Sequence, residues 1–293
     1  MTTFAGRTSL ITGAASGIGR ATALAVAARG GALVLTDRSA DQLEEAVAEV
    51  TAAGGRVLAH EAFDITDHDA VLAFANRVHA AHGAVHVVMN VAGISTWGTV
   101  ETLRHEHWKA MVDVNLLGPI SVIEAFVPAM IRAGRGGHLV NVSSAAGLFG
   151  LPWHAAYSAS KFGLRGVSEV LRFDLRQHGI HVSLVCPGAV ATGLVETVNI
   201  VGVDRDDPRV RREVGRFVHH AVSPEKAAAA IVRGVERNRF MVYTSRDIQL
   251  GHLGQRLFPW GYALVMRLAS RRFNAVFGRA RTETPEPSTP TTS

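Results

Sequence analysis

The sequence contains one cysteine among its 293 residues, and this scarcity excludes an internal disulfide framework. A single thiol fits a reducing compartment, so we expect a cytoplasmic protein. Long apolar runs are also missing: no stretch reaches about 18 uninterrupted apolar residues, so no membrane-spanning helix is expected. The first seven residues lack the apolar core of a secretory signal peptide, and none is predicted.

Acidic residues are absent from the stretch 248–282, which contains six arginines. The chain carries a formal charge of +5, and setting aside this stretch and the two glutamates after it leaves residues 1–247 at +1. The basic character is therefore a property of the C-terminal part. Because no nucleic-acid-binding motif accompanies it, we expect no nucleic-acid partner. The last residues, 282–293, are rich in Pro and Thr and are predicted to form a disordered tail.

Short runs rich in Val, Leu and Ile alternate with longer helical patterns along most of the chain. Several runs are apolar almost throughout, which is typical of parallel strands covered on both faces. The alternation predicts an α/β fold, with one domain over residues 1–247: a Rossmann-type doubly wound parallel sheet of about seven strands with helices on both faces. The expected strands are Ser9–Thr12, Ala32–Asp37, Val57–Ala62, Val85–Val91, His138–Ser143, His181–Cys186 and Phe240–Thr244. The expected helices are Gly17–Ala28, Ser39–Ala53, Asp67–His82, Glu106–Ala133, Ala155–His178 and Pro224–Asn238.

Three glycines, Gly13, Gly17 and Gly19, fall between the first expected strand and the first expected helix. Glycine allows a tight turn and lets a phosphate approach the backbone, while a helix N-terminus offers unpaired N–H groups to an anion. A glycine-rich turn without a ligand is the alternative. The flanking strand and helix favour a nucleotide site.

Asp37 ends the second expected strand, eighteen residues after Gly19. A carboxylate there accepts hydrogen bonds from ribose hydroxyls and repels a 2′-phosphate, which favours NAD over NADP. Arg38 is the complication, because a neighbouring guanidinium could hold that phosphate. An ordinary strand-end carboxylate is the structural alternative.

Tyr157 and Lys161 stand four residues apart in a stretch with a helical pattern, so they share one face of the helix. A free phenol has a pKa near ~10, and a neighbouring ammonium lowers it toward the range that acid–base chemistry on an alcohol or ketone needs. Ser144 lies thirteen positions upstream of Tyr157. Tyr and Lys at this spacing often mark only a helix surface, but together with the glycine turn they indicate an active site.

Further short motifs occur in a fixed order around these residues. With them the chain resembles the short-chain dehydrogenase/reductase family over roughly residues 5–245. Val91 stands where the family usually has a second Asn, which removes one polar contact. The segments that carry the resemblance are Thr12–Gly19, Asp64–Ile65, Asn90–Gly93, Val114–Leu116, Asn141–Ser144, Tyr157–Lys161 and Pro187–Thr192.

The resemblance implies hydride transfer between a secondary alcohol carbon and the nicotinamide of NAD, with NADP as the alternative, and without a metal. It assigns the acid/base role to Tyr157, and it gives Lys161 the roles of lowering that pKa and binding the nicotinamide ribose. It assigns the hydrogen bond to the substrate oxygen to Ser144 and a place in a proton relay to Asn115. The residues implied to bind the cofactor are Gly13, Ser16, Gly17, Ile18, Gly19, Asp37, Arg38, Asp64, Ile65, Asn90, Ala92, Gly93, Tyr157, Lys161, Pro187, Gly188, Val190 and Thr192.

The segment 193–222 mixes apolar and charged residues and is predicted to be a lid over the substrate pocket. Large apolar residues also lie between Ser144 and Tyr157, among them Phe149 and Trp153. We therefore expect a hydrophobic alcohol or ketone of lipid, steroid or retinoid type. The alternative is a lid whose apolar side chains pack on the protein itself.

The stretch 248–281 is predicted to be a basic amphipathic helical extension. Its aromatics, aliphatics and arginines suit a helix in a membrane interface, a helix over the substrate mouth, or a helix between subunits. Similar extensions in steroid- and retinol-dehydrogenase-like members of the family favour a lipophilic substrate. We favour a homodimer or homotetramer over membrane contact.

The histidines show no metal-ligand spacing: His105 and His107 point apart on a helix, and the adjacent pair 219–220 has no carboxylate or Cys nearby in sequence. His154 is expected near the pocket, and Cys186 is expected to be a small buried residue. Two other functions stay open, a catalytically silent cofactor-binding sensor or scaffold and a related epimerase or dehydratase. The complete set of four catalytic matches argues against the first, and the glycine pattern argues against the second.

Overall fold

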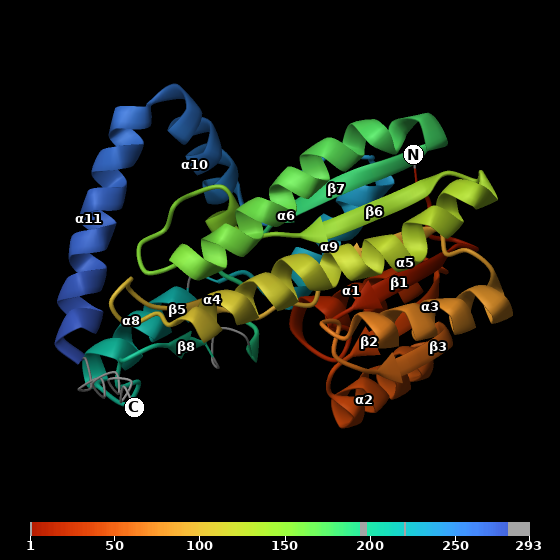
Figure 1. Cartoon of the computed structure of the whole chain (residues 1–293), viewed down its shortest axis with the longest axis horizontal. Coiled ribbons are helices and arrows are strands. Elements are labelled where there is room, and N and C mark those ends of the chain that lie inside the picture. The colour runs from red at the N-terminus through yellow and green to blue at the C-terminus, as the bar shows by residue number, and fades with distance from the viewer. Residues whose placement is uncertain (1, 194–197, 220, 281–293) are drawn as a thin grey trace, which may run out of the picture.

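The computed structural model describes residues 2–193, 198–219 and 221–280, and its arrangement is shown in Figure 1. Within these residues, seven parallel strands form one sheet in the order β3-β2-β1-β4-β6-β7-β9. This is the doubly wound α/β sheet that the alternating pattern predicts. The strands are β1 Thr8–Thr12, β2 Ala32–Asp37, β3 Arg56–Ala62, β4 Val87–Asn90, β6 Gly137–Val142, β7 Ile180–Cys186 and β9 Met241–Tyr243.

Helices cover both faces of this sheet, and each face has its own apolar core. One core joins α1 (Gly17–Ala27), α2 (Ala40–Ala52) and α9 (Pro224–Glu236) to the strands. The other joins α3 (His68–His82) and α5 (Gly118–Ala133) to the opposite face. All residues of β4 and β6 are buried, which explains the apolar residues on both faces of these strands, and the polar side chains among them are Asn90, His138 and Asn141.

The strand order reverses beside β1, which pairs with β2 on one side and with β4 on the other. Ligands of such sheets bind in the crevice outside the carboxyl ends of the strands at this reversal. The glycine turn leaves β1 at this point, and the Asn90–Gly93 segment leaves β4 beside it. The fold therefore brings together two motifs that lie far apart in the sequence.

The expected helix Glu106–Ala133 is interrupted by a π-helical turn at Asp113–Leu117, which separates α4 (His105–Val112) from α5. In the described part of the chain, the stretch His105–Ala133 is long and apolar enough to cross a membrane by length and composition alone. Asn115 is fully buried within it, and α5 packs against α3. Packing inside the protein accounts for part of the apolar character of this stretch, since 44% of its apolar window is buried.

Two strands of two residues each, β5 (Thr96–Trp97) and β8 (Asn199–Ile200), form a separate parallel pair near the ends of the main strands. Helix α6 (Ala155–Asp174) starts beside this pair, and α8 (Pro208–His219) follows it. The two short strands were not expected from the sequence, because two-residue segments show no periodicity. They attach the segment after residue 198 to the loop that follows β4.

The C-terminal extension is two helices rather than one, α10 (Arg246–Leu257) and α11 (Pro259–Phe277). The chain bends at Phe258, whose φ of −132° is not helical and which precedes a proline that disfavours a helical residue before it. In Figure 1 the two helices form an arm that stands away from the sheet, with α11 returning to α8. Helix α10 begins two residues before the predicted start of the extension, and the predicted tail 282–293 lies outside the described residues.

Candidate active site

The glycine turn has a backbone that only glycine can form. Gly13 has a φ of +67°, and a Cβ there would lie 2.7 Å from Cα of Ala92. A Cβ on Gly19 would lie 1.8 Å from the carbonyl oxygen of Gly13. Ser16 occupies the N-cap position of α1 without a side-chain capping bond, which leaves the helix N-terminus available to an anion. These residues fit the phosphates of a dinucleotide.

Asp37 links the end of β2 to the glycine turn. One carboxylate oxygen accepts a hydrogen bond from the backbone N–H of Ala15, and the other accepts one from Ser39, both at 3.1 Å. Arg38 is exposed to solvent beside it. The structure therefore places the carboxylate at the edge of the expected nucleotide site, where a ribose can reach it.

The residues after β3 and β4 that the resemblance implies in cofactor binding differ in exposure. Asp64 is exposed and accepts a hydrogen bond from the Thr66 amide at 2.9 Å, whereas Ile65 is buried under α5. The Asn90 side chain is 2% exposed and donates to Asn141 Oδ1 at 2.9 Å, so it joins β4 to β6 beneath the cavity. Contact of Asn90 with a cofactor stays a prediction.

Thr12 and Thr192 connect the glycine turn to the neighbouring loops. Thr12 Oγ1 accepts hydrogen bonds from the N–H groups of Val91 and Ala92 at 3.0 and 3.2 Å. A Cβ on Gly17 would lie 2.9 Å from Cγ2 of Thr192, so the loop after β7 passes directly over the turn.

That loop, which includes Pro187, Gly188 and Val190, is held from two sides. The Pro187 carbonyl accepts the Ala145 amide at 2.7 Å, and Val190 forms a parallel bridge with Val222. Gly188 lies against α10, since a Cβ there would be 3.0 Å from Ile248. Ile18, Gly188, Val190 and Thr192 line the same cavity as Ser144, Tyr157 and Lys161, and their contact with a nicotinamide stays a prediction.

Helix α6 presents Tyr157 and Lys161 on the same face, and both are buried, with 9% and 4% of their surface exposed. The Lys161 ammonium lies 5.8 Å from the centroid of the Tyr157 ring. It donates a hydrogen bond to the Val142 carbonyl at 3.0 Å, at the end of β6. The i,i+4 spacing therefore places the two groups side by side in the cavity wall.

The pKa values of this pair are set first by burial. Burial raises the pKa of Tyr157 above its ordinary value, and a hydrogen bond with Ser144 opposes that rise. Burial lowers the pKa of Lys161 to about 8. The expectation that the Tyr157 pKa is lowered is not met in this structure, because desolvation of the phenol outweighs the favourable contacts.

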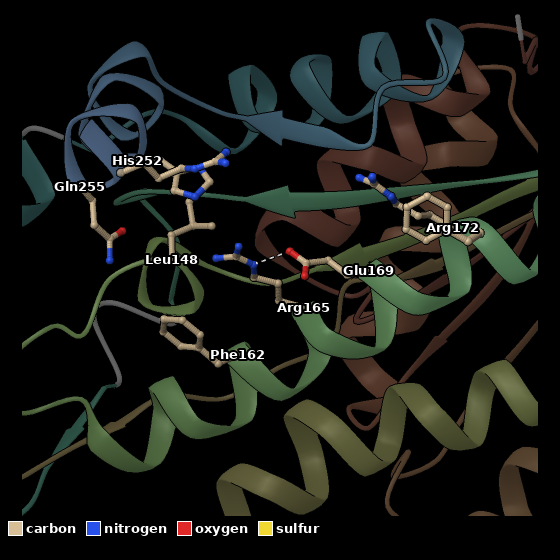
Figure 2. Close-up of a pocket in the computed structure, with 9 residues that line it drawn as sticks. Leu148, Phe162, Arg165, Glu169, Arg172, His252 and Gln255 are labelled. Atoms are coloured by element: carbon tan, nitrogen blue, oxygen red, sulfur yellow. Dashed lines mark hydrogen bonds and ion pairs between the residues drawn. The ribbon is translucent and has the colours of Figure 1, made fainter. Parts of the chain in front are cut away.

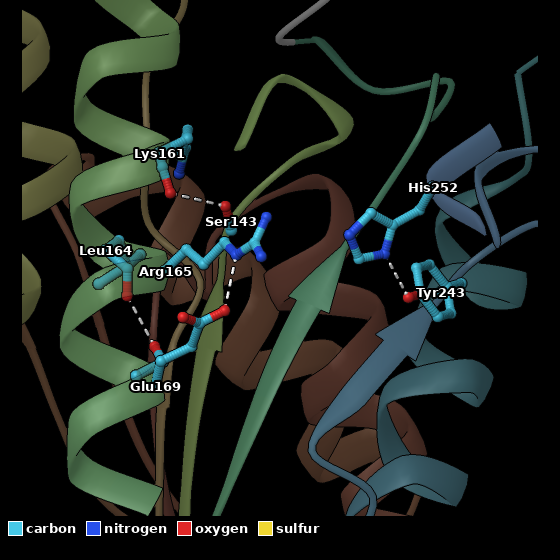
Figure 3. A network of polar contacts seen from close by, with 8 residues as sticks. Ser143, Lys161, Leu164, Arg165, Glu169, Tyr243 and His252 are labelled. Carbon is cyan, nitrogen blue, oxygen red and sulfur yellow. Dashed lines mark hydrogen bonds and ion pairs between the residues drawn. The ribbon is translucent and has the colours of Figure 1, made fainter. Parts of the chain in front are cut away.

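The two adjacent serines have different partners. Ser144 Oγ accepts the Ala146 amide at 3.1 Å and shares a hydrogen bond with Tyr157. Ser143 Oγ donates instead to the Lys161 carbonyl at 3.0 Å, a contact drawn in Figure 3. Ser144 is thus the serine beside the phenol, as the thirteen-residue spacing predicts.

Asn115 lies in the π-helical turn behind the pair and is fully buried. Its amide accepts from the Ile94 N–H and donates to the Ile94 carbonyl, each at 2.9 Å, and it also donates to Ser160 Oγ at 3.2 Å. A Cβ on Gly93 would lie 2.9 Å from Asn115 Oδ1 and 3.3 Å from Lys161 Nζ. Glycine at 93 therefore leaves the space in which these two side chains approach each other.

A cavity of about 970 Å³ opens in front of these groups. Its walls include Trp97, Phe149 and Leu151, so most of the surface near Ser144 and Tyr157 is apolar. Residues of α8, α10 and α11 complete the walls. A helix over the substrate mouth was one of three interpretations of the stretch 248–281, and α11 lines the cavity with Ala269, Arg272, Phe273 and Phe277.

His154 also lines the cavity and is 6% exposed. Its ring lies 4.4 Å from the ring of Trp97 and 6.3 Å from that of Tyr157, centroid to centroid. Burial lowers its pKa to about 4, so the imidazole is neutral at physiological pH. Cys186 is buried as expected, and burial raises the pKa of its thiol to about 12, which excludes a thiolate role.

A second hollow, of about 560 Å³, lies between α6 and α10 (Figure 2). Arg165 pairs there with Glu169 at 2.8 Å, and Tyr243 bonds to His252 at 2.8 Å on the facing side (Figure 3). These contacts lie behind the catalytic face of α6 and position α10. In the described ranges, no group of three or more His, Cys, Asp or Glu side chains could hold a metal ion.

Comparison with known proteins shows which protein family the chain belongs to. Residues 7–200 match the short chain dehydrogenase family. The chain is 34% identical to the oxidoreductase SadH of Mycobacterium tuberculosis over 277 residues, which cover 93% of this chain and 98% of SadH. The chain therefore belongs to the short-chain dehydrogenase/reductase family of NAD(P)-dependent oxidoreductases, and the fold and family expected from the motifs are confirmed.

Solved structures support the same assignment. A short-chain dehydrogenase/reductase from Burkholderia phymatum in complex with NAD is similar with a TM-score of 0.78 at 30% identity, covering 88% of this chain and 96% of that one. A metagenomic short-chain oxidoreductase in complex with NADP gives a TM-score of 0.65 at 34% identity, covering 83% and 97%. Relatives of this fold thus bind either cofactor.

Proposed function

We propose that this protein transfers a hydride between NAD(H) and a secondary alcohol or ketone that carries a bulky apolar body. The observation that supports this most directly is the buried Tyr157, hydrogen-bonded to the half-buried Ser144 in the wall of a large cavity, with Lys161 beside it. The glycine turn fits the dinucleotide, and the bound cofactor supplies the hydride acceptor or donor.

Each side chain then has a defined task. Tyr157 takes the hydroxyl proton during oxidation and returns it during reduction. Ser144 donates a hydrogen bond to the substrate oxygen, where negative charge develops in the transition state. When Lys161 is protonated, its positive charge favours the ionised form of the Tyr157 phenol. Asn115 holds the loop that borders both groups.

The lining of the cavity supports a hydrophobic substrate. The cavity of about 970 Å³ includes the residues proposed to bind the nicotinamide, and pockets for drug-sized ligands run to roughly 1,000 Å³, so the substrate shares this space with the cofactor. Trp97, Phe149 and Leu151 offer apolar surface close to the catalytic pair. A lipid-, steroid- or retinoid-like alcohol would remove this surface from water on binding.

NAD is the proposed cofactor, with NADP as the second candidate. The Asp37 carboxylate borders the glycine turn, and its negative charge opposes a 2′-phosphate. Arg38 is the neighbouring cation that an NADP-preferring protein would use. The solved relatives that contain NAD and NADP are consistent with both candidates.

A cytoplasmic homodimer or homotetramer is the proposed assembly. Large apolar side chains are exposed on α6, with Phe173 at 62%, and on the α10–α11 arm, with Trp260 at 74%. Burying such side chains against a second copy would remove them from water. The single buried cysteine is compatible with a reducing cytosol.

The test is a screen of the purified protein for changes in NADH or NADPH fluorescence across a panel of hydrophobic alcohols and ketones. Tyr157→Phe is the inactive variant, and Tyr243→Phe is its matched control because that phenol lies outside the cavity lining. Turnover that Tyr157→Phe abolishes and Tyr243→Phe retains supports the proposal. Cofactor binding without turnover of any substrate would favour a silent sensor or scaffold.

A further inference from the structure

A row of aromatic rings leads from the catalytic tyrosine to the C-terminal helix. The ring of His154 lies 6.3 Å from that of Tyr157 and 6.3 Å from that of Phe273 on α11, centroid to centroid. Phe273 is in turn 5.2 Å from Phe277. All four line the cavity that contains Ser144, so α11 forms part of the same chamber as the catalytic residues.

Helix α11 is fixed to the loop that carries the catalytic residues. Trp153 Nε1, in the segment between Ser144 and Tyr157, donates to Asn274 Oδ1 at 2.8 Å. Its ring packs against Phe277 with centroids 5.3 Å apart. Trp153 has a φ of +66°, a conformation that costs energy for a bulky residue and persists only where its surroundings hold it.

A second attachment joins α11 to α8. Arg272 contacts both carboxylate oxygens of Glu213, at 2.7 and 2.8 Å, and the Glu213 side chain is only 17% exposed. Near the end of α11, the Ala280 carbonyl accepts the Asp204 amide at 2.9 Å. The apolar residues between these contacts form one buried cluster that includes Val198, Val210 and Phe277. The helix is therefore part of the chamber wall and not a loose appendage.

We propose that α11 determines substrate specificity, with Ala269, Phe273 and Phe277 limiting how far the apolar body of the substrate extends from Tyr157. This proposal rests on the hydride-transfer function proposed above. Because the aromatic row is uncharged, it favours binding of apolar groups along its length. A substrate too short to reach α11 buries less apolar surface and is expected to bind less tightly. The ligand class is a secondary alcohol or ketone whose apolar body reaches from the reacting carbon to α11.

Two substitutions on α11 change the cavity volume next to this helix in opposite directions. Ala269→Phe enlarges a half-buried side chain that lines the cavity and so reduces the space for substrate. Phe273→Ala shortens a second lining side chain and so increases that space. Ala275→Phe is the matched control, because Ala275 is exposed on the same helix and does not line the cavity. NADH binding, followed by fluorescence, should be equal in all three variants because the cofactor motifs lie elsewhere.

The measurement is kcat/KM for a homologous series of methyl ketones of increasing chain length. Ala269→Phe should lower the ratio of long-chain to short-chain kcat/KM by about 10-fold or more, the scale of a misfit of one methylene in an apolar pocket. Phe273→Ala should move the optimum to longer or bulkier ketones. Ala275→Phe should keep the parent ratio. Equal ratios in all variants would overturn the proposal.

Ketone binding to the protein–NADH complex, measured by calorimetry, separates this proposal from the proposed reaction. Suppose that no ketone is reduced, but that a long-chain ketone binds and Ala269→Phe weakens its binding. The proposed hydride transfer is then wrong, and the proposed role of α11 in substrate specificity is supported. If ketones are reduced and neither Ala269→Phe nor Phe273→Ala changes the dependence of kcat/KM on chain length, the proposed role of α11 is wrong and the proposed reaction is supported. If no ketone binds or reacts, both proposals are overturned.

Discussion

Asn115 holds both backbone polar groups of Ile94, accepting from its N–H and donating to its carbonyl at 2.9 Å each. The π-helical turn places this amide between the loop after β4 and Ser160 on α6. A buried side chain that satisfies three groups on two elements fixes their relative position. The loop that borders the cofactor site and the catalytic helix are therefore joined through one residue.

Asn115→Leu should uncouple these elements. The change leaves the Ile94 amide and carbonyl buried without their partner, and each such loss costs about 1–3 kcal/mol. Chemical denaturation should show a free energy of unfolding that is lower by about 2–6 kcal/mol, the sum of the two losses, and turnover should fall as well. Asn115→Asp keeps the acceptor for the Ile94 N–H, but it loses the donor and places a carboxylate in a fully buried position, so we expect a loss at least as large. Unchanged stability in Asn115→Leu would contradict the assigned role.

The buried Lys161 predicts a specific pH dependence of stability. Its folded-state pKa of about 8 lies below its ordinary value of 10.5, so between these values the unfolded chain binds more protons than the folded chain. The stability contribution of this group therefore rises with pH across that window. Lys161→Met removes the effect.

The melting temperature of Lys161→Met minus that of the parent should consequently decrease as pH rises from 7 to 10, a range that brackets the lowered pKa of about 8. Thermal unfolding at several pH values measures this difference. Lys109→Met is the control, because that lysine is exposed on α4. A difference in melting temperature that stays constant or grows with pH would show that burial does not disfavour the protonated form of Lys161.

Asp37 should control the choice of cofactor. Asp37→Ala removes a carboxylate that borders the glycine turn, so kcat/KM with NADH should fall by roughly 10–100-fold, the scale of a hydrogen bond to a charged group. Use of NADPH should improve relative to NADH because the repulsion of a 2′-phosphate disappears. The exposed Asp41→Ala serves as a control for the change in charge. A parent enzyme that already prefers NADPH would contradict this assignment.

The exposed apolar surface of the arm should mediate subunit contact. Trp260→Glu places a charge on a residue that is 74% exposed, so it should leave the monomer fold intact while reducing the oligomer size in light scattering. Gln249→Glu, an exposed change on α10, should keep the parent size. Full-length protein should not co-sediment with anionic vesicles at low salt. Salt-sensitive vesicle binding with an unchanged oligomer would favour membrane contact instead.

The sequence predicted the main sheet and the neighbouring positions of Tyr157 and Lys161 because both depend on local patterns. Apolar runs and turn glycines define β1 and α1 almost to the residue, and the spacing of Tyr157 and Lys161 places them on one face wherever a helix forms. Such features need no knowledge of tertiary packing. The agreement is therefore strongest where the local pattern alone decides the structure.

The features that were missed depend on contacts between distant segments. The β5–β8 pair is too short to show a period, and nothing before the contact is made indicates that Arg272 meets Glu213 or that Trp153 meets Asn274. The raised pKa of Tyr157 belongs to the same group, because the sequence shows the nearby charge but not the extent of burial.

The central claim is that Tyr157 supports direct hydride transfer from a nicotinamide to a substrate carbonyl. Reduction of a hydrophobic ketone with NADH that carries deuterium at both C4 positions of the nicotinamide tests it, with the product alcohol analysed by mass spectrometry. We expect one deuterium on the carbinol carbon with the parent enzyme, and a rate ~10²–10⁴-fold lower with Tyr157→Phe at unchanged NADH affinity. Full activity in Tyr157→Phe, or a product without deuterium, would contradict the account.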